Sequence, residues 1–268
     1  MQFTAKANKY TLGRGQIFFA AFLPGTRTPG PEIYFGNTPE LKINTTSETL
    51  EHFSAEAGVK EVDDAATLKT TRKLSLKTDN VSPSNLALLF LGSASALTVA
   101  AATVTGESIV GARVAVDGFF SLGMTASNLA GVMNVTHGSV VVKSTDTTPV
   151  TYVEGTDYEV IYDSGIVHVL PGGAITTGEA LHVDYDCPAY TRDQTISGSQ
   201  PIEGQIRFLS ENVTGPDSNY FIPYARISPN GEFALKSDAW QELDFMGDIL
   251  KLTPSTPAVQ IDGRTFIA

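Results

Sequence analysis

The sequence predicts a mainly β protein, a β-sandwich or barrel with one short flanking helix, an extended hairpin and a small inserted β subdomain. Three observations indicate this. Residues 40–46 and 66–76 alternate between apolar and polar side chains with a period of two, as half-buried strands do. Residues 101–189 hold short apolar runs rich in Gly, Val and Thr, with turn signals between them. One stretch, 83–91, has apolar residues at helical spacing.

Length and charge limit the class of protein. A chain of 268 residues with 42% hydrophobic residues can bury a sizeable core in one or two domains. A net charge of −11 argues against a protein that grips the phosphates of nucleic acid, because such binding needs a basic footprint. Like charge still permits a surface past which nucleic acid slides without sticking.

Cys187 is the only cysteine, so neither an intramolecular disulfide nor a cysteine-rich zinc site is expected, which fits a reducing compartment. The first ten residues have no apolar core, so we expect no signal peptide. The uncharged stretch 80–106 is interrupted by Gly, Ser and Thr and has no flanking Lys/Arg cluster, so we do not expect it to cross a membrane.

The N-terminal part begins with turn glycines and a strand. Gly13-Arg14-Gly15 precedes the apolar run 16–22, but the third glycine of a dinucleotide-binding loop is missing and the following residues are strand-like. Residues 24–31 hold three prolines and two glycines and are expected to form a loop. Tyr34-Phe35 and the turn 36–39 then lead into the hairpin.

The hairpin has two predicted arms, 40–46 and 66–76. Arg72 falls on the apolar side of the second arm, so we expect a bulge or a charge partner there. Residues 47–65 are too long for a turn and strongly acidic, and we predict a polar loop. The loop residues expected to reach another molecule are Glu48, Glu51, His52, Phe53, Glu56, Glu61, Asp63 and Asp64. A solvated loop on an ordinary sandwich is the alternative.

The helix has local start and stop signals. Ser82 can cap its first turn and Pro83 suits the first helical position. Gly92 is placed to end it. Leu86, Leu89 and Phe90 are the side chains that we expect to pack on a sheet; they lie at helical spacing.

The rest of the chain reads as strands. In the inserted subdomain they are 113–116, 139–143, 158–162, 166–170 and 181–185. Long alternating strands return afterwards, at 204–209, 220–226, 232–236 and 241–251. Pro223 favours an edge or a bulge, and Met246 breaks a polar face, as a subunit contact would explain. The predicted domains are 1–100 with 190–268, and the insertion 101–189.

The order of several phrases adds a resemblance. They are Gly13 to Phe22, Phe35-Gly36-Asn37-Thr38-Pro39-Glu40, the hairpin, Asp79-Asn80-Val81-Ser82, Gly204-Gln205-Ile206-Arg207-Phe208, Tyr220 to Pro223 and Ala239-Trp240-Gln241-Glu242-Leu243. Together they resemble the tail tube (major tail) proteins of long-tailed bacteriophages, over about 11–91 and 202–251.

The resemblance implies a tail-tube β-sandwich that closes into rings of six, which stack into a tube that conducts DNA. Hairpin strands would line the lumen, and the loop between them would reach the neighbouring ring. The lumen-facing candidates are Lys42, Lys69, Lys73, Arg207, Glu232 and Lys236. Because most of these are cations, we expect cross-strand or cross-subunit pairs to neutralise them.

The implied partners are further copies of the chain and other tail proteins, namely the tape measure, tail terminator and distal tail proteins. DNA would pass without specific binding, and no membrane is involved. The protein would be assembled in the host cytoplasm and reside in the virion tail.

No catalytic, cofactor or metal site is expected. His52, His137, His168 and His182 are scattered without ligand spacing. The acidic residues that could collect around calcium lack the spacing of a calcium loop; they are Asp157, Asp163, Asp184 and Asp186. Motifs for a serine elbow, a phosphate loop or a zinc helix do not occur in the sequence.

Three functions compete. The leading one is a self-assembling structural protein without enzymatic activity. The second is a β-sandwich recognition module that binds a carbohydrate or surface receptor through Phe119, Phe120 and Tyr152. The third is a hydrolase using carboxylates such as Glu242 and Asp244, which would need a deep pocket with raised pKa values.

Overall fold

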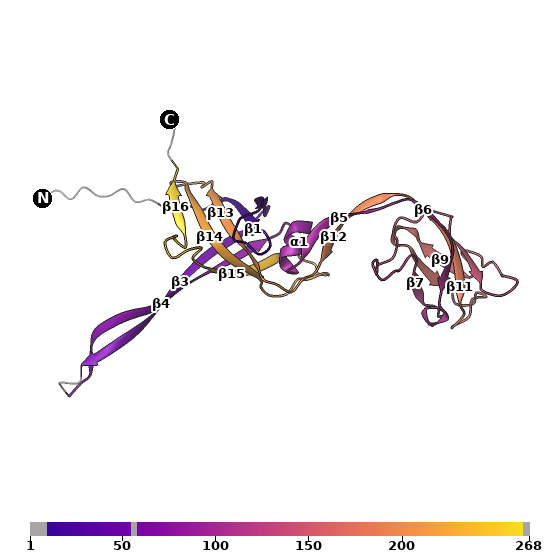
Figure 1. Ribbon diagram of the computed structural model, residues 1–268, viewed down its shortest axis with the longest axis horizontal. Helices are drawn as coiled ribbons and strands as arrows, with labels where there is room; N and C mark the ends of the chain where they lie inside the picture. Colours follow the sequence, from indigo (N-terminus) through magenta and orange to yellow (C-terminus); the bar gives the residue numbers. More distant parts are fainter. Residues whose placement is uncertain (1–9, 55–57, 265–268) are drawn as a thin grey trace. The chain divides into compact units, whose positions relative to one another are not determined.

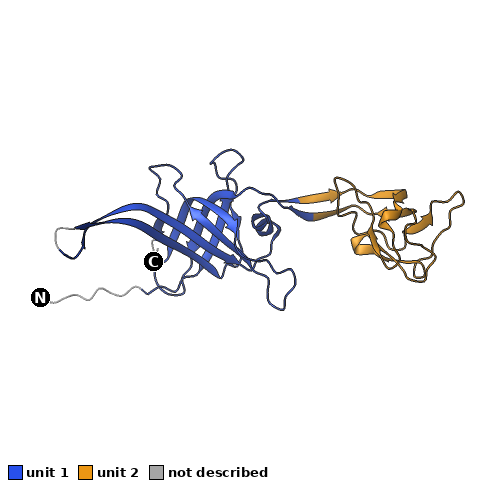
Figure 2. Cartoon of the chain, turned by 90° about the horizontal axis from the view of Figure 1, so that it is seen from below, with its two compact units in different colours: residues 1–95, 193–268 blue, residues 96–192 orange. Residues whose placement is uncertain are grey.

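The protein consists of two compact β units, shown in Figure 2. A computed structural model describes residues 10–54 and 58–264. Unit 1 comprises residues 1–95 and 193–268, and unit 2 comprises residues 96–192. The fold is mainly β with several antiparallel sheets, and α1 (Pro83–Leu89) is the one α-helix in the described residues. The predicted insertion, 101–189, lies inside unit 2.

Unit 1 is built on one large antiparallel sheet in the order β2-β1-β13-β14-β15-β4-β3, with β16 paired to β14 (Figure 1). Its strands are β1 (Gly15–Ala21), β2 (Ile33–Tyr34), β3 (Glu40–Ser54), β4 (Glu61–Thr78), β13 (Ile202–Ser210), β14 (Ser218–Pro229), β15 (Leu243–Ile249) and β16 (Gln260–Gly263). A register shift lies between Gly204 and Ile206 of β13, opposite the β14 segment that holds Pro223, as that proline predicts.

The core of unit 1 covers one face of this sheet. Alternate residues of the strands point into it, among them Phe19, Leu76, Ile206, Ile227 and Phe245, all nearly inaccessible to water. Helix α1 packs Leu88 and Leu89 onto the same cluster. The opposite face of the sheet therefore holds the polar residues.

Helix α1 begins as predicted, but the residue that takes the left-handed conformation after it is Leu91 and not Gly92. The Ser82 side chain accepts a hydrogen bond from the Asn85 N–H, and proline occupies the first turn. Leu91, with φ of 52°, takes the left-handed position, and the Gly92 N–H bonds to the Ala87 carbonyl at 2.8 Å. Gly92 is needed because a Cβ there would lie 1.8 Å from the Ile196 carbonyl oxygen. The helix buries Asn85, Ala87, Leu88 and Leu89, whereas Phe90, predicted to be core, is 44% exposed.

Unit 2 holds two small antiparallel sheets, β6-β11-β8 and β7-β10-β9. Their strands are β6 (Ala102–Ile109), β7 (Phe119–Ser121), β8 (Val141–Ser144), β9 (Tyr158–Ile161), β10 (Ile166–Val169) and β11 (Leu181–Cys187). Short 3₁₀ helices, η1 (Gly111–Arg113) and η2 (Tyr162–Ser164), lie between them. Val142, Val167, Leu181 and Val183 are completely buried in its core. The strands β5 (Ser93–Val99) and β12 (Tyr190–Ile196) form a two-stranded ribbon. The chain passes from one unit to the other within each of these strands.

Two predicted strands are wrong. Residues 232–236 alternate but lie in the irregular segment between β14 and β15, because they pair with no neighbouring strand in the described chain. Residues 113–116 begin with the last residue of η1 and are not a strand. No helix among the described residues is long and apolar enough to cross a membrane.

Candidate functional site

The predicted loop between the hairpin arms is wrong, because both strands continue through it. β3 and β4 pair from Glu40 opposite Lys77 to Ser54 opposite Glu61. The β15–β4 pairing ends at Arg72, so beyond it the two strands pair only with each other in the described chain. Figures 1 and 2 show this outer part of the hairpin running beyond the sheet of unit 1.

Two irregularities in β4 conceal this hairpin in the sequence. The register shifts between Glu48 and Thr49 and again between His52 and Phe53, so β4 has one extra residue at each place, Leu68 and Asp63. Each extra residue changes which side chains share a face, so the period of two is lost. Arg72, for which a bulge or partner was expected, lies in continuous register and has no ion pair among the described residues.

The outer hairpin leaves large apolar side chains in water. Leu50 and Leu68 are each 61% exposed, and Phe53 and Val62, directly opposite each other near the end, are 48% and 51% exposed. Leu50 and Phe53 differ by three positions in a strand without extra residues, so they lie on opposite faces. The outer hairpin thus exposes apolar groups on both faces.

The predicted loop residues lie along these exposed strands. Seven of the eight, Phe53 among them, are exposed residues of β3 or β4. The eighth, Glu56, lies outside the described residues. Glu48 is opposite Lys69, and His52 Nδ1 lies 2.5 Å from an oxygen of Asp63. The segment is acidic, as predicted, but it is an extended ribbon and not a loop.

Four of the six lumen-facing candidates share the polar face of the sheet. The register places Lys42, Lys69 and Lys73 on the face opposite Leu74 and Leu76, and Arg207 follows on that face through β15, β14 and β13. Glu232 and Lys236, also predicted there, lie in the segment between β14 and β15 and are not on a strand face. That part of the prediction is wrong for the same reason as the strand 232–236.

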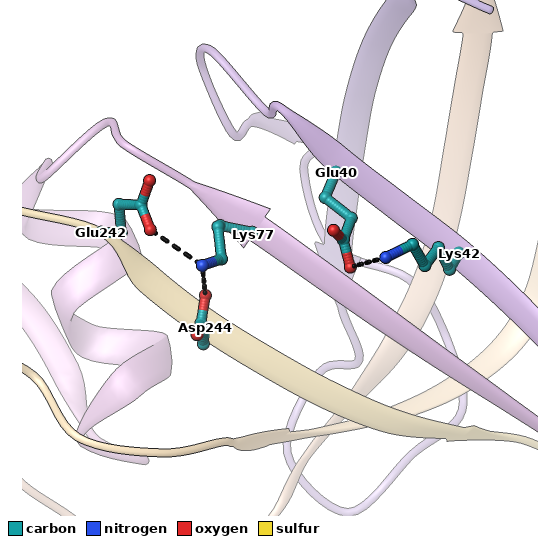
Figure 3. A network of polar contacts seen from close by, with 5 residues as sticks. All are labelled: Glu40, Lys42, Lys77, Glu242 and Asp244. Carbon is teal, nitrogen blue, oxygen red and sulfur yellow. Dashed lines mark hydrogen bonds and ion pairs between the residues drawn. The ribbon is translucent and has the colours of Figure 1, made fainter.

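Carboxylates neutralise most cations of this face within one chain. Figure 3 shows two examples: Lys42 Nζ lies 2.7 Å from Glu40, and Lys77 Nζ lies 2.8 Å from Glu242 and 3.4 Å from Asp244. The hydrogen bond to Glu242, together with the charge of Asp244, raises the pKa of the Lys77 amine. Figure 3 thus shows cations of β3 and β4 with their counter-charges on the same strand, on β15 or on the residue just before β15.

Two arginines of the same face are paired as well. Arg207 Nε lies 3.0 Å from Glu32, and Arg226 NH2 lies 2.6 Å from Glu203. Burial alone would raise the pKa of the Glu203 carboxyl, but hydrogen bonds from Arg226 and Tyr224 outweigh it and lower that pKa. Arg207 also lies 5.1 Å from the centre of the Phe221 ring, a cation–π contact.

Lys69 and Lys73 form no ion pair in the described part of the chain, although Glu48 and Asp248 lie opposite them in register. Sequence reasoning singled out the cations and missed Lys77 and Arg226, together with the partners Glu32, Glu242 and Asp244. These partners lie on or next to other strands, so only the arrangement of the strands, which the sequence pattern did not give, could have identified them.

The aromatic residues of unit 2 proposed for recognition are mostly core. Phe120 and Tyr152 are buried, and the Tyr152 hydroxyl donates to Glu179. Phe119 is 60% exposed and stacks on His168 with ring centres 4.2 Å apart. His168 in turn lies 3.1 Å from the Asp117 carboxylate.

The acidic residues of unit 2 hold the fold together. Asp157 is buried and accepts hydrogen bonds from the N–H groups of Val153 and Ala174, which lower the pKa of its carboxyl. Asp184 pairs with Lys143 at 2.6 Å, which lowers the pKa of the Asp184 carboxyl. Within residues 10–54 and 58–264, no three His, Cys, Asp or Glu side chains gather as a metal site would need.

No curated protein matches the sequence. One family model matches residues 10–258, which is most of the chain and covers all of unit 2 and most of unit 1. The protein therefore belongs to the family described as protein of unknown function UCP028589.

Proposed function

We propose that this protein is a structural subunit that assembles with further copies of itself into a tube, as the tail tube proteins of long-tailed bacteriophages do. Six copies would close a ring, and rings would stack into a conduit for DNA in the virion tail, together with tape measure, terminator and distal tail proteins. The observation that carries this proposal is the outer part of the β3–β4 hairpin, exposed on both faces.

The hairpin needs a neighbour for a physical reason. A two-stranded ribbon alone is at best marginally stable in water, and this one continues well past the last residue that β15 supports. It also exposes Leu50, Phe53, Val62 and Leu68, which would gain free energy by leaving water. A second copy that covers the ribbon would remove both costs.

Strand β3 also favours closure with other copies. It is the last strand of the sheet order, and its outer edge has no neighbour among the described strands. A long free edge exposes unpaired N–H and C=O groups and invites pairing with another chain. Closure into a ring is one way in which β proteins remove such edges.

The polar face suits the wall of a conduit for DNA. Lys42, Lys77, Arg207 and Arg226 are each paired with carboxylates of the same chain. Paired cations are poor phosphate ligands, because gripping DNA requires unneutralised Lys and Arg. Lys69 and Lys73 have no ion pair in the described chain but lie opposite Glu48 and Asp248, so the wall would offer DNA few unneutralised cations.

A shortened hairpin tests the proposal. Replacement of residues 48–69 by Asn-Gly joins Ser47 to Thr70, which are already opposite each other, through a turn suited to a two-residue connection. We expect this variant to keep the thermal unfolding of the parent and to lose stacking into tubes, as measured by sedimentation and electron microscopy. Leu129→Ala, which removes an exposed apolar group of unit 2, is the control and should assemble normally. Tubes formed by the shortened variant would contradict the proposed role of the hairpin.

A second candidate function belongs to unit 2. Phe119 with His168 and Asp117 forms an exposed aromatic and polar patch, and sugars commonly stack on such rings. We propose this patch as a recognition site for a carbohydrate. Binding on a glycan array that Phe119→Ala abolishes would support it, and equal binding by both proteins, or none by either, would refute it.

A further inference from the structure

The segment between β14 and β15 presents the single tryptophan of the chain to water. Trp240 is 94% exposed and Leu235, in the same segment, is 79% exposed. Trp is the residue type most enriched at the energetic centres of interfaces, and an isolated exposed one has no role in the core. These two side chains form what we call the Trp240 knob.

The knob is held in place by its own chain. Phe233 packs edge-on against Phe90 with ring centres 6.5 Å apart. The Gln241 side chain donates to the Ala234 carbonyl at 3.0 Å, and the Asn230 N–H bonds to the Asp244 carbonyl at 2.9 Å. The segment is thus tied at its start, middle and end, so little conformational entropy would be lost when the knob binds.

Unit 1 also has a groove of about 820 Å³ on the core face of its sheet, lined by both apolar and polar residues. Its apolar lining includes Leu41, Ile43 and Phe208, which are partly or largely exposed, and the nearly inaccessible Ile17, Ile206 and Ile222. Its polar lining includes Thr11, Asn37, Ser210 and Ser218. Of the side chains that line it in the described structure, only Arg14 is charged, and Arg14 has no carboxylate partner among the described residues. A volume in this range is enough to enclose two large apolar side chains.

We propose that the Trp240 knob of one copy occupies this groove on the next copy. The two surfaces match in chemistry: the apolar knob can contact Leu41, Ile43 and Phe208 of the groove, and Asp238, two residues before Trp240, can pair with Arg14 in the lining. This rests on the proposed function, since it assumes assembly between copies of the chain, and it supplies a contact other than the hairpin.

The contact is directional. Because knob and groove are different surfaces of one chain, each copy offers its knob to one neighbour and its groove to another. Such a contact repeats until a ring closes or a filament grows. A stacked tube needs contacts within rings and between rings, and the hairpin alone provides one kind.

Intrinsic fluorescence of the full chain measures the burial of the knob directly, because Trp240 is the only tryptophan. On assembly we expect the emission to shift to shorter wavelength and acrylamide quenching to fall. Tubes whose emission stays that of the monomer would overturn the inference and leave the proposed function standing. Absence of assembly at every concentration would overturn both.

Variants of knob and groove test the same contact from both sides. Trp240→Ala should raise the critical concentration for assembly more than about tenfold, as truncation of an interface hot spot does. Gly13→Phe should do the same by filling the groove, because Gly13 has ordinary φ and nothing within 4 Å of an added Cβ. Leu129→Ala is again the control. If Gly13→Phe blocked assembly and Trp240→Ala did not, another segment, such as the hairpin, would occupy the groove and the inference would be wrong.

Exchanging the charges of Arg14 and Asp238 tests whether these two side chains pair across copies. Arg14→Glu and Asp238→Arg should each weaken assembly, and the double variant should recover it, because the pair would be re-formed across copies with its signs reversed. Neither side chain has an ion pair in the described chain, so the single variants should unfold at the parent's temperature. Losses that simply add in the double variant would refute this pairing.

Discussion

Asn85 is the polar residue on which the junction of helix and sheet depends. Its side chain is fully buried and donates to the carbonyls of Phe35 and Asn80, each at 2.8 Å. The Phe35 carbonyl also accepts from the side chains of Thr78 and Asn80, and the Asn80 carbonyl accepts from the Ser82 N–H, so Asn85 belongs to a shared network. This side chain therefore ties the start of α1 to the segment after β2.

Replacement of Asn85 by Ala should lower the free energy of unfolding by about 2 kcal/mol, because two hydrogen bonds of about 1 kcal/mol each are lost. Urea unfolding measures it, and Asn44→Ala, an exposed change on β3, is the matched control. Equal stability of the two variants would show that water or relaxation satisfies these carbonyls.

Asp157 makes unit 2 sensitive to acid. Backbone N–H groups of Ala174 and Val153 hold the pKa of its carboxyl below the ordinary value. Because the folded pKa is depressed, this stability is fully present above the unfolded pKa of about 4 and is lost as the pH falls through the folded value. Neutral pH leaves the contribution intact.

Thermal unfolding of Asp157→Asn between neutral and acid pH tests this effect. The variant should be less stable than the parent at neutral pH and the difference should shrink as the pH falls below about 4. Asp146→Asn, an exposed change in the same unit, is the control and should follow the parent. A difference that is constant with pH would mean that the carboxylate charge is not what stabilises the loop.

At the scale of elements, local signals were predictable and pairing was not. Ser82 and Pro83 mark the helix start correctly because capping depends only on neighbouring residues. The hairpin was misread between 47 and 65, because its strands carry Glu, Asp and Thr on exposed faces and the extra residues of β4 break their period. Residues 232–236 have a strand pattern without a strand partner.

For the candidate site too, the sequence predicted which face a side chain lies on but not which residue it contacts. Cations of alternating strands could be assigned to one polar face from the sequence, as Lys42, Lys73 and Arg207 illustrate. The ion-pair partners of these cations depend on the register of the strands. The position of the Trp240 knob depends on contacts of the irregular segment between β14 and β15, such as that of Phe233 with Phe90. Such tertiary relations leave no periodic trace in a sequence.

The outer hairpin should be the least protected part of unit 1 in the monomer. Its amides in β3 and β4 beyond Arg72 belong to a solvated two-stranded ribbon, so they should exchange with solvent through local opening, far faster than those of β14. Assembly should protect them. Hydrogen exchange of monomer and assembled protein measures this, and exchange that is unchanged on assembly would mean that no second copy covers the ribbon.

For the whole molecule, charge and contact surfaces act in opposite directions. A net charge of −11 makes copies repel one another, while the hairpin and the Trp240 knob offer apolar area. Salt shortens the reach of this repulsion, with a Debye length of about 30 Å at 0.01 M and about 3 Å at 1 M. Apolar contacts are not weakened in the same way.

Added salt should therefore lower the critical concentration for assembly, as followed by light scattering. The Arg14→Glu variant, which adds further negative charge, should respond more strongly than the parent. Assembly that is lost at high salt would instead show that ion pairs between copies, and not apolar burial, supply the attraction.

The central question about this protein is whether its copies assemble into a tube. Electron microscopy of the purified full chain across a concentration series tests this directly. We expect rings or hollow tubes of uniform width, because each copy offers two different contact surfaces to its neighbours. Monodisperse small particles at every concentration, with the hairpin still open to solvent, would contradict the account.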